Sequence, residues 1–343
     1  MLALAGLPLG LEFVFFTDRD DDCGSALGDT IIAPYTDEPA LLDFASRCDA
    51  ITFEFENVPA GSVRFLAERV PVRPGPSLLE VAQDRIDEKH MLVDAGVATP
   101  AFAAVDSIES LHAAVDKVGL PAVIKTRRFG YDGKGQRVLR SADEIDAAWE
   151  ELGSYPLIAE ALVPFVRELS VIAVRSAAGE ICVYPLAENH HSGGILRTSI
   201  VPAPNLDAEV RAEAHAIAER IMERHDYVGV LTVELFEFGD DRAAGPRLMA
   251  NEIAPRVHNS GHWSLDGAVT SQFENHVRAV AGLPLGDCSA RCACLMENVI
   301  GEPPDVRAVL AEPKAKLHMY GKSPREGRKL GHITRLGPEL PAP

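Results

Sequence analysis

The sequence predicts a mixed α/β and α+β protein of two or three domains, and three observations support this fold class. The length of 343 residues exceeds what a single typical domain needs. Residues 1–75 alternate strand-length apolar runs with short helices, which is typical of a parallel α/β sheet. Beyond them, helices alternate with antiparallel strand pairs, and residues 292–333 have the pattern of short β segments.

The composition excludes several classes of protein. Hydrophobic residues make up 47% and charged residues 24%, a globular balance that excludes disorder as the main state. The net charge of −18 argues against nucleic acid as a general partner. Because no run of 18 apolar residues occurs, we expect no membrane span. The apolar segment 1–10 has no basic region and no cleavage site, so it does not resemble a signal peptide.

The six cysteines are too few for a disulfide scaffold. Cys288, Cys292 and Cys294 cluster, but no second Cys/His pair lies nearby at zinc-binding spacing. We therefore predict reduced structural cysteines and a cytosolic setting.

The N-terminal region contains three expected strands, at residues 11–17, 30–33 and 50–55, and a helix at residues 38–48. In a parallel α/β unit, a strand and its loop come before the first helix. This sequence instead opens on a helix-like segment at residues 1–7. We therefore expect that the first strand and its turn are missing.

Proline and glycine residues delimit one long expected helix from Pro76 to Gly96. A β-hairpin follows, in which strands 122–126 and 137–139 flank a glycine-rich loop at residues 127–136. Residues 282–286 interrupt the pattern and mark a domain boundary. The other expected helices and strands span residues 107–118, 142–152, 156–162, 168–175, 180–186, 206–225, 230–238, 247–253 and 264–280.

The glycine-rich loop can close over a nucleotide triphosphate. Its glycines allow backbone amides to approach phosphate oxygens, and Lys125, Arg127, Arg128 and Lys134 add positive charge. The loop lies between two strands, so it is neither a Walker loop nor a dinucleotide-binding fingerprint. A tight hairpin with solvated charges is the alternative reading of this segment alone.

Two glutamates, Glu234 and Glu252, lie within apolar strands where core residues are expected. An unpaired buried carboxylate is costly, but two carboxylates with Asn251 can hold Mg²⁺ between nucleotide phosphates. Exposed glutamates on a sheet edge are the alternative.

Two further segments are rich in anion-binding side chains. The run Ala254-Pro-Arg-Val-His-Asn-Ser-Gly-His262 holds an arginine suited to phosphate or carboxylate and two histidines suited to oxyanions or proton transfer. A zinc site is a weak alternative there, because no third ligand is nearby. Residues 322–329 hold four cations that could bind a phosphate monoester, although a solvated basic loop fits equally.

Together these features resemble the 5-(carboxyamino)imidazole ribonucleotide synthase family of ATP-grasp enzymes. The resemblance covers essentially the whole chain, and its most specific run begins at Asn251, whereas the glycine loop is shared with other ATP-grasp ligases. The matching segments are Glu54-Phe-Glu-Asn57, Gln83-Asp-Arg85, Lys125-Thr-Arg-Arg128, Gly130-Tyr-Asp-Gly-Lys-Gly-Gln136, Glu188-Asn-His-His191, Asn251-Glu-Ile-Ala-Pro-Arg-Val-His-Asn-Ser-Gly-His262, Ser271-Gln-Phe-Glu274 and Gly327-Arg-Lys-Leu-Gly-His332.

The resemblance implies an ATP-grasp fold in three domains. Residues 1–75 would form a Rossmann-like pre-ATP-grasp domain that lacks its first strand. Residues 76–286 would form the ATP-grasp domain, with a glycine-rich lid around 120–162, and residues 287–343 a β-rich domain that closes the substrate site. The family begins with a strand and a glycine-rich loop, so we expect roughly 10–20 further residues before Met1 in the natural protein.

The resemblance also implies the reaction. An ATP- and Mg²⁺-dependent ligase, with two Mg²⁺ ions, would form carboxyphosphate from bicarbonate and carboxylate the exocyclic amine of 5-aminoimidazole ribonucleotide. We expect a cytoplasmic homodimer of purine biosynthesis that binds ATP, bicarbonate and this ribonucleotide, and no nucleic acid or membrane.

The site residues are carried over by position. Metal ligands would be Glu234 and Glu252, and catalytic residues Asp132, Arg256 and His258, with Asp132 and His258 both open as the general base. Substrate-binding residues would be Glu56, Asn57, Tyr131, Arg256, His258, Lys322 and Arg328. ATP-binding residues would be Arg85, Lys125, Gly130, Tyr131, Asp132, Gly133, Lys134, Gly135, Gln136, Glu160, Ala161, Leu162, Val163, Glu168, His191, Asn251 and Glu252.

Two alternatives remain at this point. One is another ATP-grasp ligase of purine synthesis, such as the formate-dependent glycinamide ribonucleotide transformylase, although the Gly-Arg-Lys loop favours the carboxylase. The other is a truncated nucleotide-binding protein with little activity, supported only by the missing first strand.

Overall fold

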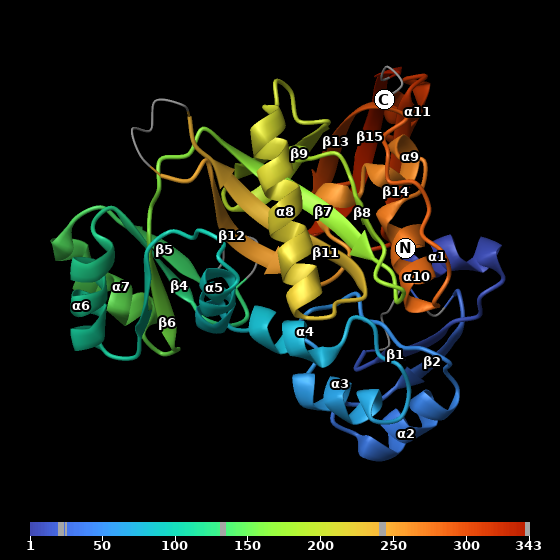
Figure 1. The fold of residues 1–343 in the computed structure, drawn as a ribbon, viewed down its shortest axis with the longest axis horizontal. Helices are drawn as coiled ribbons and strands as arrows, with labels where there is room; N and C mark the ends of the chain where they lie inside the picture. The colour runs from blue at the N-terminus through green and yellow to red at the C-terminus, as the bar shows by residue number, and fades with distance from the viewer. Residues whose placement is uncertain (20–23, 25, 131–134, 240–244, 340–343) are drawn as a thin grey trace.

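The fold is described from a computed structural model that covers residues 1–19, 24, 26–130, 135–239 and 245–339. The structure is built around a nine-stranded central sheet (Figure 1). A small N-terminal α/β region and a four-stranded α/β region lie beside the central sheet, and the C-terminal strands extend that sheet at one end.

The N-terminal region contains a two-stranded parallel sheet of β1 (Val14–Thr17) and β2 (Asp29–Ile32), which confirms the predicted parallel start. The prediction of a third strand at residues 50–55 is wrong. There only Ile51 forms a bridge, to Val72, because its N–H and C=O pair with the 71–73 segment.

Helices cover this region and tie it to the rest of the chain. α2 (Glu38–Ser46) and α3 (Ala60–Ala67) pack in one hydrophobic cluster with the strands. α2 begins at Asp37, whose carboxylate accepts the Ala40 N–H as an N-cap. α1 (Leu2–Gly6) instead packs against α10 (Gln272–Val280), far along the sequence (Figure 1).

The long helix expected over residues 76–96 is two helices, α4 (Pro76–Ala82) and α5 (Arg85–Asp94). The break lies at Asp84, which has an extended backbone and caps α5 by accepting the Ile86 N–H. Its carboxylate also accepts hydrogen bonds from Arg127 at 2.9 Å, so the break joins α5 to the end of the β-hairpin.

A four-stranded antiparallel sheet of order β3-β6-β4-β5 forms the region that contains the glycine loop. The predicted β-hairpin is confirmed, because β4 and β5 pair directly. The elements of this region are β3 (Phe102–Val105), α6 (Ile108–Val118), β4 (Ala122–Thr126), β5 (Gln136–Leu139), α7 (Ile145–Leu152) and β6 (Leu157–Ala161).

The central sheet has the order β12-β11-β7-β9-β10-β13-β15-β14, with β8 paired to β7. The C-terminal strands therefore continue this sheet through the pairing of β13 with β10. Its strands are β7 (Arg167–Arg175), β8 (Ile181–Val183), β9 (Ala187–Ser192), β10 (Ile195–Val201), β11 (Gly229–Glu237), β12 (Leu248–Ala254), β13 (Cys292–Ile300), β14 (Ala315–Met319) and β15 (Lys329–Glu339).

The sheet has a core on each face because side chains alternate along its strands. On β7, Leu169 and Val171 belong to the cluster under α8 (Ala208–Arg224), which crosses the sheet in Figure 1. Ile172 and Val174 belong to the opposite cluster, which packs against α10. Strands buried on both faces explain the continuous apolar runs in the sequence.

Two other predictions are corrected by the structure. The helix expected over 264–280 is a short α9 (Ser264–Gly267) followed by α10, because Ser271 starts a new helix by capping the Glu274 N–H. Cys182 and Cys288 form a disulfide, whereas the sequence predicts reduced cysteines. These two residues are 106 positions apart in the sequence, and both lie in the hydrophobic cluster that packs against α10.

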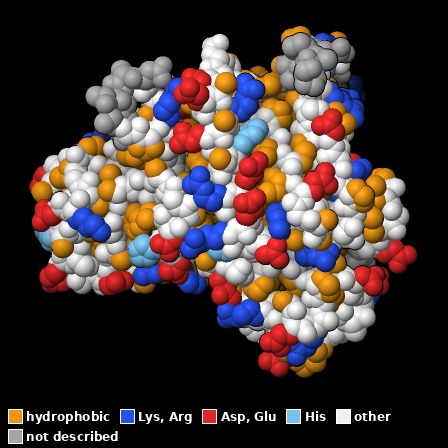
Figure 2. Space-filling model, in the orientation of Figure 1, with side chains coloured by type: hydrophobic (Ala, Val, Ile, Leu, Met, Phe, Trp, Pro, Cys, Tyr) orange, Lys and Arg blue, Asp and Glu red, His pale blue; other side chains and the backbone are white. Residues whose placement is uncertain are grey.

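The C-terminal part also contains α11 (Val306–Ala311), which lies beside β14. In the described residues, no helix is both long enough and apolar enough to cross a membrane. Acidic and basic side chains are interspersed over the face drawn in Figure 2, so the excess negative charge forms no single patch there.

Candidate active site

The two predicted carboxylates meet on adjacent strands. Glu234 on β11 lies directly opposite Glu252 on β12. Burial and the charge of Glu252 raise the pKa of Glu234 to about 7. Partial burial also favours the neutral form of Glu252, but Arg85, whose Nη1 donates to its Oε2 at 2.9 Å, holds its pKa at about 2. The pair is therefore a site of concentrated negative charge beside one arginine.

The donor set at this pair fits Mg²⁺. Asn251 Oδ1 is buried and has no hydrogen-bond partner among the described residues. No group of three His, Cys, Asp or Glu residues in the described ranges can hold a metal by itself. Two carboxylates and an amide oxygen suit a Mg²⁺ ion that completes its shell with waters and phosphates. Glu234, Glu252 and Asn251 would hold the ion, which would neutralise phosphate charge.

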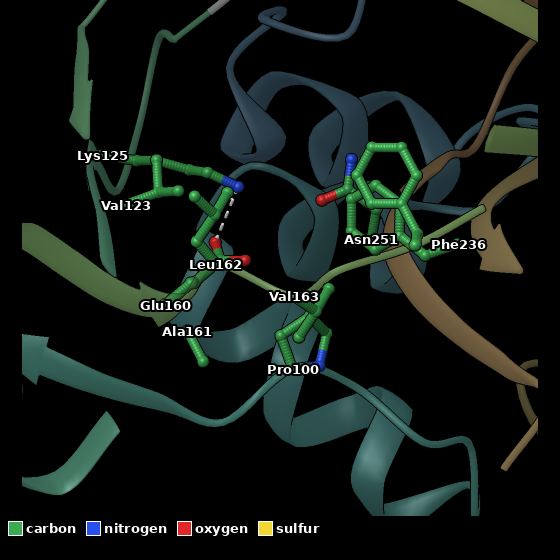
Figure 3. A pocket seen from close by; sticks show the side chains of 10 residues that line it. Pro100, Val123, Lys125, Glu160, Ala161, Leu162, Val163, Phe236 and Asn251 are labelled. Atoms are coloured by element: carbon green, nitrogen blue, oxygen red, sulfur yellow. Dashed lines mark ion pairs between the residues drawn. The ribbon is translucent and has the colours of Figure 1, made fainter. Parts of the chain in front are cut away.

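A pocket lies between the four-stranded region and the central sheet (Figure 3). Lys125 and Glu160, from the adjacent strands β4 and β6, point toward each other on one side of it, with Lys125 Nζ 3.0 Å from Glu160 Oε1. Most of its lining is apolar, which suits a base better than a phosphate. The lining residues are Pro100, Val123, Lys125, Glu160, Ala161, Leu162, Val163, Phe165, Phe236 and Asn251.

Two aromatic residues of this pocket have no counterpart in the sequence prediction. The rings of Phe165 and Phe236 stack with centroids 4.6 Å apart. Phe236 is two positions from Glu234, so both side chains lie on the same face of β11. The spacing from Glu234 is the only feature of the sequence that points to Phe236. An apolar residue within an apolar strand does not stand out from its neighbours.

The structure also pairs Glu168 with His191, two residues of the predicted ATP-binding set. Glu168 Oε2 lies 2.7 Å from His191 Nδ1. Burial lowers the pKa of His191, but the hydrogen bond and charge of Glu168 outweigh burial, and the net pKa is raised. The charges of Glu234 and Glu252 also raise this pKa, so the imidazole lies near the carboxylate pair.

A second cluster of predicted residues lies next to the carboxylate pair. Arg256 Nη2 is 2.9 Å from Glu56 Oε2, and its Nε donates to the same oxygen at 3.1 Å. His258 Nε2 lies 3.4 Å from Glu234 Oε1. Burial, together with the charge of Arg256, holds the pKa of His258 well below its usual value, so the ring is neutral. Arginine, a neutral imidazole and a carboxylate thus converge near the metal-type glutamates.

Two glutamine side chains hold the backbone segments that carry Glu56 and His258. Gln83 Nε2 donates to the carbonyls of Glu56 and Val58 and holds the loop that carries Glu56. Gln272 accepts the N–H of His258 and donates to its carbonyl at 2.7 Å. Both glutamines belong to the segments that the sequence singled out, Gln83-Asp-Arg85 and Ser271-Gln-Phe-Glu274.

The basic C-terminal loop approaches the same site. The positive charge of Lys329, at the start of β15, contributes to the low pKa of His258 and opposes the net rise in the pKa of Glu234. Arg328 is partly buried and donates to the Ser323 carbonyl at 3.3 Å, while Lys322 is exposed with Nζ 5.4 Å from the Tyr320 ring centroid. Lys329 is one of the four cations of residues 322–329 but is not among the predicted site residues.

The remaining predicted site residues have few described contacts at the site. Tyr131, Asp132, Gly133 and Lys134 lie outside the described residues. Asn57 is exposed on the loop after Glu56. The described residues Gly130, Gly135 and Gln136 lie at the two ends of the glycine-rich loop. Gly135 has a φ of +69°, and a Cβ there would meet Thr126 Oγ1 at 2.7 Å. Glycine is therefore required at that position.

Family models match nearly the whole chain. An ATP-grasp domain matches residues 90–273, a ribonucleotide synthetase preATP-grasp domain residues 1–83, and a phosphoribosylaminoimidazole carboxylase C-terminal domain residues 294–342. The chain is therefore an ATP-grasp protein with its preATP-grasp and C-terminal domains, as its fold and site indicate.

Similar proteins narrow this class. The N5-carboxyaminoimidazole ribonucleotide synthase of Pseudomonas aeruginosa is 49% identical, over 97% of this chain and 90% of its own. The synthetase structure from Thermus thermophilus has a TM-score of 0.92 and 49% identity, over 98% of this chain and 90% of its own. A synthase from Aspergillus clavatus, in complex with ADP and 5-aminoimidazole ribonucleotide, has a TM-score of 0.89 and 28% identity over the same shares. The chain belongs to the N5-carboxyaminoimidazole ribonucleotide synthase family, which confirms the resemblance seen in the sequence.

Proposed function

We propose that this protein carboxylates 5-aminoimidazole ribonucleotide with bicarbonate at the expense of ATP. The products are N5-carboxyaminoimidazole ribonucleotide, ADP and phosphate. Family membership over the whole chain supports this reaction, as do the ATP complex and the complex with ADP and 5-aminoimidazole ribonucleotide of similar fungal enzymes.

The chemistry has three balanced steps. A bicarbonate oxygen bonds to the γ-phosphorus of ATP, and the bond from that phosphorus to the bridging oxygen breaks to release ADP. The resulting carboxyphosphate splits into CO₂ and phosphate. The exocyclic amine of the ribonucleotide attacks CO₂ and loses a proton to give the carbamate. Because phosphoryl transfer spreads charge over oxygens, the protein contributes mainly positioning and electrostatic stabilisation.

The observation that supports this function best is that a carboxylate pair suited to a cation lies next to an arginine and a histidine suited to an anion. The Glu234–Glu252 pair lies beside the nucleotide pocket, and Arg256 and His258 follow β12 directly, with His258 3.4 Å from Glu234. An arginine at this position can hold bicarbonate in line with the γ-phosphate of a nucleotide in the pocket. Glu56 pairs with Arg256 and orients its guanidinium.

The proposed division of roles follows the sequence prediction. Arg256, His258 and Asp132 take part in the chemistry, with Asp132 and His258 still open as the general base. Glu56, Asn57, Tyr131, Lys322 and Arg328 bind the ribonucleotide together with Arg256 and His258. ATP is bound by Arg85, Lys125, the loop residues 130–136, residues 160–163, Glu168, His191, Asn251 and Glu252.

Several finer features are part of the same proposal. Glu234 and Glu252 would hold two Mg²⁺ ions, which would supply positive charge to neutralise the triphosphate, and the buried unpaired Asn251 Oδ1 supports a site there. The working protein is a cytoplasmic homodimer with domains at residues 1–75, 76–286 and 287–343; the family resemblance supports this. Light scattering of the purified protein tests the dimer, and a monomeric mass would contradict it.

Transfer of isotopic oxygen tests the carboxyphosphate step. With ¹⁸O-labelled bicarbonate and the ribonucleotide, a single turnover before exchange with water is expected to yield phosphate that carries one ¹⁸O atom. Mass spectrometry of the phosphate is the measurement. Phosphate that contains oxygen only from ATP and solvent would show that bicarbonate is not the acceptor of the γ-phosphoryl group.

Arg328→Ala tests the assignment of the ribose phosphate to the basic loop. We expect the KM for 5-aminoimidazole ribonucleotide to rise about tenfold, because a charge-assisted hydrogen bond to phosphate is lost. The KM for ATP should stay within about twofold. Steady-state ADP release measures both constants, and the exposed Arg307→Ala is the matched control. An unchanged KM for the ribonucleotide would remove Arg328 from this site.

A further inference from the structure

Lys89 is a buried lysine beside the nucleotide pocket to which no role has been given so far. It lies on α5 and is 1% exposed. Its Nζ lies 3.2 Å from Glu160 Oε2 and donates to the Asn251 carbonyl at 2.5 Å. A buried ammonium is costly unless it is paired and hydrogen-bonded, so its two partners explain how it is tolerated there.

These two contacts join three elements that form the nucleotide site. Glu160 lies at the end of β6 in the four-stranded region, and its other oxygen is 3.0 Å from Lys125 on β4. Asn251 lies on β12 in the central sheet, next to Glu252. Lys89 therefore connects the side that carries the base pocket to the strand that carries the carboxylate pair.

The neighbours of Lys89 form a continuous network of contacts. Glu160 lies between Lys89 and Lys125, with one oxygen toward each ammonium. On the same helix, Arg85 Nη1 donates to Glu252 Oε2 at 2.9 Å, and Glu88 Oε1 accepts the Ile253 N–H at 2.6 Å. α5 is therefore tied through three of its side chains to β12, and through Lys89 also to β6.

We propose that Lys89 is a positioning residue for ATP. It holds Glu160, and through it Lys125, in a fixed position relative to Asn251 and Glu252 on β12, and this aligns the base pocket with the phosphate site. Lys89 acts through these partners and does not itself touch the nucleotide. The inference rests on the proposed function for its substrate, but only on nucleotide binding and not on the carboxylation chemistry.

Lys89→Met tests this inference, because methionine keeps most of the side-chain volume and removes the charge and the donor. We expect the KM for ATP and the Kd for ADP, the latter by calorimetry, to rise at least tenfold. The KM values for bicarbonate and 5-aminoimidazole ribonucleotide should stay within about twofold. The exposed Lys117→Met, at the end of α6, is the matched control and should leave all constants unchanged.

A purely structural role predicts a different result. Loss of packing would lower the melting temperature and the fraction of active enzyme but leave the KM for ATP of the folded fraction unchanged, and that outcome would overturn the proposal. If Lys89→Met does not fold, Lys89→Gln removes the charge and keeps a hydrogen-bond donor on a shorter side chain. The same ADP calorimetry then applies, and an unchanged Kd in that variant would overturn the proposal.

Failure of the proposed reaction can be told apart from failure of this inference. Wild-type protein that binds ADP but does not consume bicarbonate would contradict the carboxylation and still allow the Kd comparison. Conversely, full carboxylation by wild type with an unchanged ADP Kd in Lys89→Met would contradict only the role of Lys89.

Discussion

Glu252→Gln is expected to lower the rate of ATP turnover by roughly a thousandfold, because the amide cannot supply the negative charge that a divalent cation and Arg85 require. Glutamine has the same shape, and the side chain is 36% exposed. The melting temperature should therefore stay within a few degrees, because the carboxylate serves the ligand rather than the core. Steady-state ADP release and thermal unfolding measure the two effects.

Glu297→Gln is the matched control for this change. Glu297 also lies on a strand of the central sheet, β13, and pairs with an arginine, Arg335, at 2.8 Å, but outside the site. We expect its turnover to equal that of wild type. Turnover of Glu252→Gln at the wild-type rate would contradict the metal assignment for the Glu234–Glu252 pair.

Arg256→Lys is expected to lower kcat/KM for bicarbonate about a hundredfold. Lysine keeps the positive charge beside Glu56, but it loses the planar fork that can hold a carboxylate or phosphoryl oxygen in a fixed orientation. ATP binding should change little, because the nucleotide pocket and Arg85 are intact. The measurement is initial ADP release against bicarbonate concentration in degassed buffer.

The control for Arg256→Lys is a second arginine–glutamate pair outside the site. Arg278 pairs with Glu274 at 2.5 Å on α10, so Arg278→Lys makes the same chemical change there. It should leave kcat/KM for bicarbonate at the wild-type value. A loss confined to the KM for ATP in Arg256→Lys would instead move Arg256 out of the bicarbonate site.

Much of the fold could be predicted because its signals are local. The apolar runs of β7 and β11 and the glycine-rich hairpin have spacings that indicate strands, and the structure contains them. The errors lie where a single side chain restarts a helix. Asp84 and Ser271 act as N-caps within helix-like sequence, and neither polar residue interrupts the apolar periodicity that indicated one long helix.

The site was predictable where polar residues stand out against an apolar strand. Glu234 and Glu252 were found for that reason, and the structure places them opposite each other. Phe236 and Phe165 could not be found in this way, because they resemble core residues. Lys89 lies in a polar helix, and only the tertiary contacts with Glu160 and Asn251 distinguish it from a solvated lysine.

The disulfide shows the same limit. Cys182 belongs to a short edge strand and Cys288 to the segment before β13, and the spacing between them carries no signal. Their proximity depends on the core that α10 forms on one face of the sheet.

The most direct test of the central claim is ADP release by the purified protein, with bicarbonate and 5-aminoimidazole ribonucleotide supplied together, singly or not at all. The account predicts rapid ADP release, matched by loss of the free amine, only when both are present. Rapid release that is independent of the ribonucleotide, or release that formate supports in place of bicarbonate, would contradict it.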